Sequence, residues 1–349
     1  MKSKFIVIIV FLGFILINCE SSPGGSGNQS DLEDALLYLI SMDGKISLDG
    51  FGDETTEIEN YIDDDDGSYL GRGSMDVIWT LPVRWGRYDI NVEGSVVFEE
   101  YALDADTIYA EISKFITGIL VVINGDTATT DTGFAFSPTD TTEKPFEMES
   151  LRRIRFVRNN DSGNMLEDWK INGLTPAVCT SPGSTVDITS ISIERLVSFN
   201  ENGLGIFEPY FSLDFGNDIL NMFFTNSEWP HFLHHEFLKI KVDVDNTNPN
   251  MTSYQDSGEG VFIHYGRKFD HKGRRRLFDD GSQVSFHGYF SNDGMENDNE
   301  FTRLWKVHQT LDNHHYRSFF DVIDYETFLN PDGEYHSKMV LFPYWVIND

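Results

Sequence analysis

The sequence has only two cysteines in 349 residues, Cys19 and Cys179. A chain with so few cysteines has no disulfide framework, and we expect Cys179 to be a small packed side chain rather than a nucleophile. Basic residues are also scarce, since 26 lysines and arginines stand against 57 aspartates and glutamates, for a formal net charge of −31. This negative field repels phosphates, so we expect no nucleic acid partner.

The sequence also lacks the motifs of several common enzyme classes. It contains no G-x-S-x-G element of serine hydrolases, no Walker phosphate loop and no G-x-G-x-x-G of dinucleotide-binding folds. The many carboxylates neither exclude nor locate a catalytic pair. We therefore expect a protein without catalytic activity.

The histidines raise the question of a zinc site. His231, His234 and His235 are close in sequence, as are His314 and His315, but the H-E-x-x-H arrangement is absent. Adjacent histidines on a strand point to opposite faces, so each pair offers one ligand to a face. We expect solvated histidines or histidines packed on aromatic rings, with zinc binding as the alternative.

Long apolar runs are missing except at the N-terminus. Lys2 and Lys4 precede an apolar run over residues 5–17, which is shorter than the roughly 18–20 residues that span a bilayer. The run stops at Leu16-Ile17-Asn18-Cys19, before a stretch rich in Ser and Gly. An aliphatic residue three places before a cysteine resembles the lipobox of bacterial lipoproteins, although Asn18 stands where that family usually has Gly, Ala or Ser.

The lipoprotein resemblance implies an address in the cell. Residues 1–18 would be a signal peptide, Cys19 the lipidated N-terminus carrying palmitate-type chains, and residues 19–34 a flexible linker. The protein would then be lipid-anchored in the cell envelope, at the outer membrane or cell surface, with the membrane as a partner through its lipid. An uncleaved anchor, or an ordinary signal with a chance cysteine, is the alternative.

The rest of the chain predicts a mostly β protein. Clusters of Val, Ile, Thr, Tyr and Phe alternate with Gly, Asn and Asp, as in short strands joined by turns. Because roughly 330 residues exceed what one core usually serves, we predict two domains, at 35–180 and 181–349. Residues 31–40 have the apolar spacing of a short helix, and Asn124-Gly125 predicts a hairpin turn after a strand.

The first predicted domain resembles a known arrangement. Residues 153–158 read R-I-R-F-V-R and residues 168–171 read D-W-K-I, which predicts two strands joined by a turn. A leading helix, long strands, an R-x-R-F-x-R strand and a D-W-x-I strand are similar to the NTF2-like or cystatin-like α+β fold over about residues 31–178. Arg153, Arg155 and Arg158 either line an anion-binding face or form ion pairs in this acidic protein.

The second predicted domain resembles an immunoglobulin-like β-sandwich of bacterial surface proteins. Alternation over residues 186–193 predicts its first strand, and segments around 318–322 and 339–346 predict its last ones. Two turns, D-D-G at 279–281 and N-D-G at 292–294, look like the D-D-G…D-G signature of extracellular sandwich modules.

These turns offer hard oxygen ligands of the kind that calcium takes in sets of about six to eight. The candidate calcium ligands are Asp279, Asp280, Asn292, Asp293 and Asp298. In the alternative, the same Asp and Asn side chains bond nearby backbone N–H groups.

Together these features favour a non-catalytic binding or structural role at the cell envelope, with an envelope protein or a glycan as the partner. The alternative is a hydrolase that acts on glycans, with its site on the concave face of the first domain or at the domain junction. A cleft with two carboxylates about 5–10 Å apart would favour that enzyme.

Overall fold

The computed structural model describes most of the chain after residue 28, and the description is confined to those residues. They are 29–43, 45–46, 83–130, 133–201, 205–215, 218–248, 258–266, 273–279, 284–286, 289–291, 298–307 and 314–347. The fold is mostly β, as predicted, with curled antiparallel sheets. The predicted signal peptide, Cys19 and three candidate calcium ligands (Asp280, Asn292, Asp293) lie outside the described residues.

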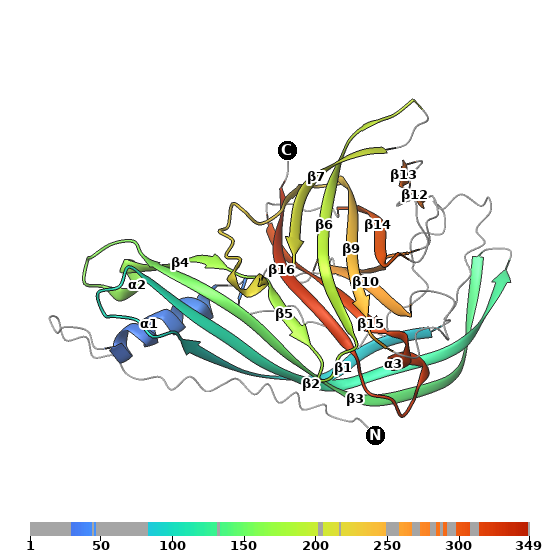
Figure 1. Cartoon of the computed structure of the whole chain (residues 1–349), viewed down its shortest axis with the longest axis horizontal. Helices are drawn as coiled ribbons and strands as arrows, with labels where there is room; N and C mark the ends of the chain where they lie inside the picture. The colour runs from blue at the N-terminus through green and yellow to red at the C-terminus, as the bar shows by residue number, and fades with distance from the viewer. Residues whose placement is uncertain are drawn as a thin grey trace, which may run out of the picture.

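A ten-stranded sheet runs the length of the molecule (Figure 1). Its strand order is β1-β2-β3-β5-β16-β15-β10-β11, with β4 paired to β3 and β8 to β16. Every pairing is antiparallel except that between β8 and β16. The strands are β1 (Val83–Phe98), β2 (Thr107–Thr130), β3 (Gly133–Arg158), β4 (Trp169–Leu174), β5 (Ala177–Thr180), β8 (His231–Leu233), β10 (Glu259–Tyr265), β11 (Gly273–Arg276), β15 (His314–Asp324) and β16 (Ser337–Ile347).

A four-stranded sheet of order β14-β9-β6-β7 packs against part of the large one, and β12 and β13 form a separate pair. These strands are β6 (Val186–Phe199), β7 (Gly205–Asp214), β9 (Phe237–Asn246), β12 (Val284–Phe286), β13 (Tyr289–Ser291) and β14 (Glu300–Lys306). An isolated bridge between Phe278 and Thr302 links the end of the large sheet to β14. The helices are α1 (Gln29–Met42), α2 (Met165–Asp168), η2 (Ile219–Asn221) and α3 (Tyr325–Leu329).

The predicted hairpin turn at Asn124-Gly125 is wrong. Strand β2 continues through both residues to Thr130, which pairs with Gly133 at the start of β3. The register shifts between Asn124 and Gly125, so this pair forms an irregularity within a long hairpin. Turns and bulges both use the backbone conformations that Asn and Gly adopt easily, so the dipeptide alone does not distinguish them.

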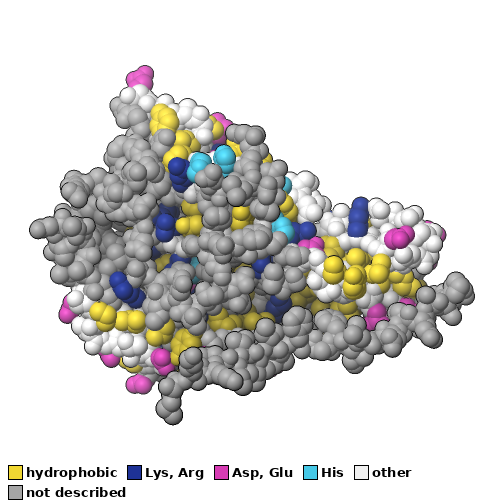
Figure 2. Space-filling model, turned by 180° about the vertical axis from the view of Figure 1, so that it is seen from behind, with side chains coloured by type: hydrophobic (Ala, Val, Ile, Leu, Met, Phe, Trp, Pro, Cys, Tyr) yellow, Lys and Arg dark blue, Asp and Glu magenta, His cyan; other side chains and the backbone are white. Residues whose placement is uncertain are grey.

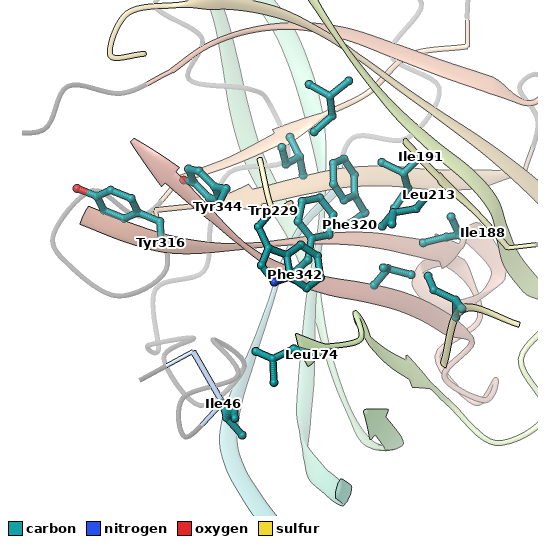
Figure 3. Close-up of a cluster of buried hydrophobic side chains, with 14 of the residues drawn as sticks. Ile46, Leu174, Ile188, Ile191, Leu213, Trp229, Tyr316, Phe320, Phe342 and Tyr344 are labelled. Carbon is teal, nitrogen blue, oxygen red and sulfur yellow. The ribbon is translucent and has the colours of Figure 1, made fainter. Parts of the chain in front are cut away.

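The large sheet separates two hydrophobic cores. The first, here called the sandwich core, lies between β10, β15 and β16 and the four-stranded sheet. Figure 3 shows Ile191 and Leu213 of the small sheet facing Phe320 and Phe342 of the large one, with Trp229 stacked on Phe342. On β10, β15 and β16, the residues that alternate with those of the sandwich core point to the other face of the sheet. They form a second cluster, here called the curled core, which includes Phe319 and Leu341 and also Trp85 of β1.

The curled core exists because the sheet bends until its first and last strands meet. The guanidinium of Arg274 on β11 lies 3.8 Å from the ring centroid of Trp85 on β1. Its Nη2 also donates to the Trp85 carbonyl oxygen at 3.2 Å. The pairing of β1 is irregular between Tyr88 and Asn91, where Asp89 has a φ of 54°. Such a bulge bends its strand and increases the local twist, which supports the curl.

The predicted short helix is confirmed as α1, which runs two residues beyond the expected 31–40 at each end. It buries Leu32, Leu36 and Ile40, which follow each other at helical spacing. These side chains join the same cluster as Ile154 and Phe156 of β3. The helix therefore covers the outer end of the long strands, away from the small sheet (Figure 1).

The large sheet runs across the boundary predicted between residues 180 and 181. Strand β5, which ends at Thr180, pairs with β3 on one side and with β16 on the other. Hydrogen bonding therefore joins the two predicted halves into one sheet. Within the described ranges, no helix combines the length and apolar character needed to cross a bilayer.

Candidate functional site

A cleft of about 530 Å³ lies where the large sheet meets the start of β6 and the segment after β7. Strands from both predicted halves line it, so it lies at one of the two places that we named for a glycan hydrolase site, the other being the concave face of the first domain. The lining residues are Glu149, Leu151, Val178, Thr180, Ser181, Pro182, Asp187, Phe215, Asp218, Ile219, Leu220 and Lys338.

The floor of the cleft is set by the strand register. Thr180 on β5 pairs with Glu149 on β3 and with Lys338 on β16, so these three side chains form a row across three strands. The neighbouring row contains Leu151 and Val178, which also pair directly. Directly paired residues project from the same face of a sheet. The floor thus has a polar row beside an apolar one.

The roof comes from the short segment around η2. The Asp218 carboxylate accepts a hydrogen bond from the Leu220 backbone N–H at 3.2 Å and caps this turn. The cap holds Ile219, which is 7% exposed, and the half-buried Leu220 over the cleft. Phe215 adds an aromatic wall and is fixed by a backbone bond from its N–H to the Thr189 carbonyl oxygen.

The cleft carries more negative than positive charge. Its lining has three carboxylates, on Glu149, Asp187 and Asp218, and one ammonium, on Lys338. The Lys338 Nζ lies 3.2 Å from Asp187 Oδ1, and the Lys338 side chain is 17% exposed. The positive charge is therefore already balanced, while the carboxylates of Glu149 and Asp218 add negative charge beside the apolar row.

The structure describes two of the five candidate calcium ligands and brings them together. The Asp279 carboxylate accepts bonds from the backbone N–H groups of Asp298 and Asn299, at 3.2 and 3.1 Å. The Asp298 side chain accepts from the Glu300 N–H at 3.1 Å. These bonds are the backbone role that we gave as the alternative to calcium. In the described part of the chain, no group of three or more His, Cys, Asp or Glu side chains is arranged to hold a metal ion.

The arginines of β3 make contacts within the protein. Arg153 forms an ion pair with Glu99, and its guanidinium lies 5.4 Å from the Phe223 ring centroid. Arg155 stacks on the same ring at 5.4 Å, and Arg158 lies 5.2 Å from the Trp169 ring centroid. Arg153 thus forms an ion pair, as in the alternative that we gave, whereas Arg155 and Arg158 pack on aromatic rings.

The histidines are partly as expected. His231 stacks on Trp345, with ring centroids 5.0 Å apart, and its Nδ1 lies 2.7 Å from the Trp229 carbonyl oxygen. The rings of His234 and His235 are 5.1 Å apart and do not point to opposite faces. Strand β8 ends at Leu233, so strand alternation does not apply to this pair.

A buried polar network in the curled core was not predicted. Arg87 Nη2 donates to Asp321 Oδ2 at 2.8 Å, and both side chains are fully buried. Ser337 Oγ donates to Asp321 Oδ1 at 2.9 Å, Arg87 Nε donates to the Tyr335 hydroxyl at 2.9 Å, and His264 Nε2 lies 3.6 Å from Asp321 Oδ2. The one sequence signal was an aspartate, Asp321, inside the apolar strand 319–323.

The electrostatics of this network indicate a structural role. Burial alone would raise the pKa of Asp321, yet the charge of Arg87 and the neighbouring His264 hold it below its ordinary value. Burial raises the pKa of Cys179, on the same core, to about 11. Cys179 is 1% exposed, which confirms a packed thiol. A carboxylate held ionised and enclosed on all sides anchors strands rather than reaching a substrate.

The chain matches no protein-family model, no curated protein and no solved structure.

Proposed function

We propose that the protein is a lipid-anchored cell-envelope lipoprotein that binds a small ligand without catalysing a reaction. The observation that carries the binding role is the cleft between the large sheet and the η2 segment. Its volume of about 530 Å³ lies within the roughly 300–1,000 Å³ of small-molecule sites. Six of the twelve lining residues are apolar, and small-molecule sites combine apolar side chains with polar groups that orient the ligand.

The envelope address rests on the lipobox-like Leu16-Ile17-Asn18-Cys19 segment. Helix α1 begins ten positions after Cys19, so lipid on Cys19 would hold the α1 end of the molecule near a membrane. Figure 2 shows hydrophobic side chains gathered on the lobe that carries α1. On α1 itself, Tyr38 and Met42 are 51% and 66% exposed, which suits a surface that lies close to lipid.

The finer fold assignments belong to the same proposal. Helix α1 packed on β1–β4 supports an NTF2-like or cystatin-like first half. The four-stranded sheet that faces β10, β15 and β16 across the sandwich core supports an immunoglobulin-like second half. Both halves share one sheet, so the junction that forms the cleft is held by β5 and is not a hinge between separate bodies.

Anchoring is tested by growing expressing cells with a labelled fatty acid. The wild-type chain should take up the label and sediment with membranes, while Cys19→Ala should do neither. Cys179→Ala is the matched control, because it removes the other cysteine and should keep both properties. Label in the Cys19→Ala chain would refute lipidation at this residue.

Binding is tested with 4-phenylbutanol, a neutral probe with an apolar body. The full chain is held in phosphatidylcholine nanodiscs and titrated by calorimetry, with empty nanodiscs as the blank. Val178→Trp fills the cleft floor and should abolish the binding heat, and Thr180→Phe should do the same from the neighbouring row. Val97→Trp, at a 61% exposed position of β1, is the control. Binding that survives both cleft variants would place the ligand elsewhere.

The presence of three carboxylates in the cleft keeps the glycan hydrolase as a second candidate. Glycosidases use a pair of carboxyl groups that flank the scissile bond. In this cleft, however, Asp187 pairs with Lys338 and Asp218 caps η2, so both have structural partners. The proposal predicts no release of phenol from aryl glycosides. Release that is lost in Glu149→Gln would favour the hydrolase instead.

A further inference from the structure

We propose that the cleft selects a small organic cation, an amine or guanidinium carried on an apolar body; this inference rests on the proposed binding function. The feature that carries it is the juxtaposition of the polar row Glu149–Thr180–Lys338 with the apolar row Leu151–Val178 under the η2 roof.

The apolar part of the ligand has a defined place. Leu151 and Val178 lie on the strands, and Phe215, Ile219 and Leu220, from the segment after β7, complete the apolar lining of the same cleft. An alkyl or aryl group between these surfaces would bury apolar area at about 25 cal/mol per Å². A fully hydrated ion gains nothing from this part of the cleft, so the ligand must carry hydrocarbon as well as charge.

The charged part of the ligand meets carboxylates. The Lys338 ammonium lies 3.2 Å from Asp187, so a carboxylate or phosphate on the ligand would have to compete with Asp187 for it. The same anion would approach Glu149 and Asp218. A cation instead meets Glu149, which is exposed at the edge of the floor and lies two strand spacings, about 9–10 Å, from Lys338. The Lys338 charge is paired with Asp187, which offsets its repulsion of a cation bound at Glu149.

The electrostatic field of the whole chain also favours a cation over an anion. With a net charge of −31, the protein attracts small cations and raises their local concentration. Because both this field and the Glu149 contact are electrostatic, the preference for a cation should weaken as salt is added.

The test uses three probes that share one apolar body: 4-phenylbutylamine, 4-phenylbutanol and 4-phenylbutyrate. They are titrated into the full chain in phosphatidylcholine nanodiscs at low salt, with empty nanodiscs as the blank. We expect the ammonium to bind about tenfold more tightly than the alcohol, and the carboxylate to bind most weakly. The ammonium preference should fall toward that of the alcohol at 1 M salt, where the screening length is about 3 Å.

A matched pair of variants assigns the preference to one residue. Glu149→Gln should reduce the ratio of ammonium to alcohol affinity by about threefold to fivefold, as expected for a partly exposed charge pair. Glu147→Gln removes the same charge from the same face of β3, outside the cleft lining, and should leave the ratio unchanged. Glu149 is exposed, so its substitution should not unfold the protein.

The outcomes separate this inference from the proposed function. Equal affinities of the three probes, or an unchanged ratio in Glu149→Gln, would overturn cation selectivity while the neutral probe still supports a binding cleft. No binding of 4-phenylbutanol or of the amine would overturn both. Tighter binding of the carboxylate would also refute the inference and would point to Lys338 as the dominant charge.

Discussion

The two faces of β10, β15 and β16 are built from the same strands and differ in kind. On the sandwich side, alternate residues such as Ile263, Phe320 and Phe342 are apolar and buried. On the curled side, the positions between them mix rings and aliphatic groups with His264, Arg317 and Asp321, which are equally buried. The sandwich face is therefore apolar at its centre, and its buried carboxylates, Glu259 and Asp324, lie at strand ends where Asn246 and Thr185 donate to them. The curled face instead places charged side chains at its centre.

The two faces differ because one packs against a second sheet and the other closes the large sheet on itself. At their centre, two sheets that pack face to face need only complementary apolar side chains. A sheet that curls until its own ends meet must bring particular strands together, and directional contacts such as those of Asp321 with Arg87 and Ser337 fix which strands those are. The two faces should therefore respond differently to single and double substitutions.

The largest effect is expected at the buried ion pair. Asp321→Leu should destabilise the protein by about 4–5 kcal/mol, because it leaves Arg87 buried without this carboxylate. Arg87→Met should cost a similar amount. The double variant should be less destabilised than the two single ones added together, since both charges are gone. Denaturant unfolding monitored by tryptophan fluorescence measures all three, and simple additivity would contradict the coupling.

The apolar face should behave differently. Phe342→Ala should cost about 3–4 kcal/mol, because Phe342 is 1% exposed and stacks on Trp229 and Phe320. Phe342 packs on rings rather than on a charge, and Leu36 lies under α1 at the outer end of the long strands, so Phe342→Ala combined with Leu36→Ala should show nearly additive losses. Phe199→Ala, at a 46% exposed position, is the control and should change the free energy of unfolding by less than about 0.5 kcal/mol.

The sequence predicts the local elements of this molecule but not the pairing of strands that are far apart in the chain. Period-two alternation located β6, apolar segments located parts of β15 and β16, and helical spacing located α1, because each depends on local pattern. The pairing of β5 with β16 joins Thr180 to Lys338 over a separation that no local pattern reports. For the same reason the sequence named only two places for a hydrolase site, the concave face of the first domain and the domain junction, and no residues that line the cleft. Its residues follow from the register of three strands and could not be read from any single segment.

The burial of Arg152 is a second feature that the sequence did not predict. Arg152 lies on the buried face of β3 with Ile154 and Phe156, and it donates to the Thr175 carbonyl oxygen at 3.1 Å. Residues 153–156 alternate between arginine and apolar side chains, and the structure buries Ile154 and Phe156 while Arg153 and Arg155 are half-buried. Arg152 is on the same buried face but donates to a backbone carbonyl oxygen instead of packing among apolar side chains. The sequence does not show that this arginine is buried while Arg153 and Arg155 are more exposed.

The free energy of unfolding should depend on pH through Lys114, with an effect smaller than that of Phe342→Ala. Burial, together with the charge of Arg152, lowers the pKa of Lys114 from 10.5 to about 8. Below pH 8 the lysine is charged in both states, so the folded state carries the full penalty, at most about 3 kcal/mol at 1.36 kcal/mol per pKa unit. Between pH 8 and 10.5 the folded state releases this proton before the unfolded state does, so stability should rise with pH.

The measurement compares the protein with its Lys114→Met variant. The variant should be more stable by about 1–3 kcal/mol at pH 7, and its advantage should shrink toward pH 10. The thiol of Cys179 acts in the opposite direction, because its raised pKa makes stability fall from pH 9 to about 11. Because the charge of Lys114 also lowers the pKa of Cys179, the comparison is made in a Cys179→Ala background, which removes the contribution of the thiol. A constant difference from pH 7 to 10 would contradict the assignment to Lys114.

The smallest effect is expected where the two sheets join, at the bridge between Phe278 and Thr302. Asp279 follows this bridge and accepts two backbone N–H bonds, so Asp279→Ala should cost about 1–2 kcal/mol. Asp279→Asn keeps one acceptor oxygen and should lose less. Because these bonds need no cation, the loss should be equal in EDTA and in calcium. A loss confined to calcium-containing buffer would instead assign Asp279 and Asp298 to a calcium site, and the seam between the sheets would then be stabilised by an ion rather than by backbone bonds.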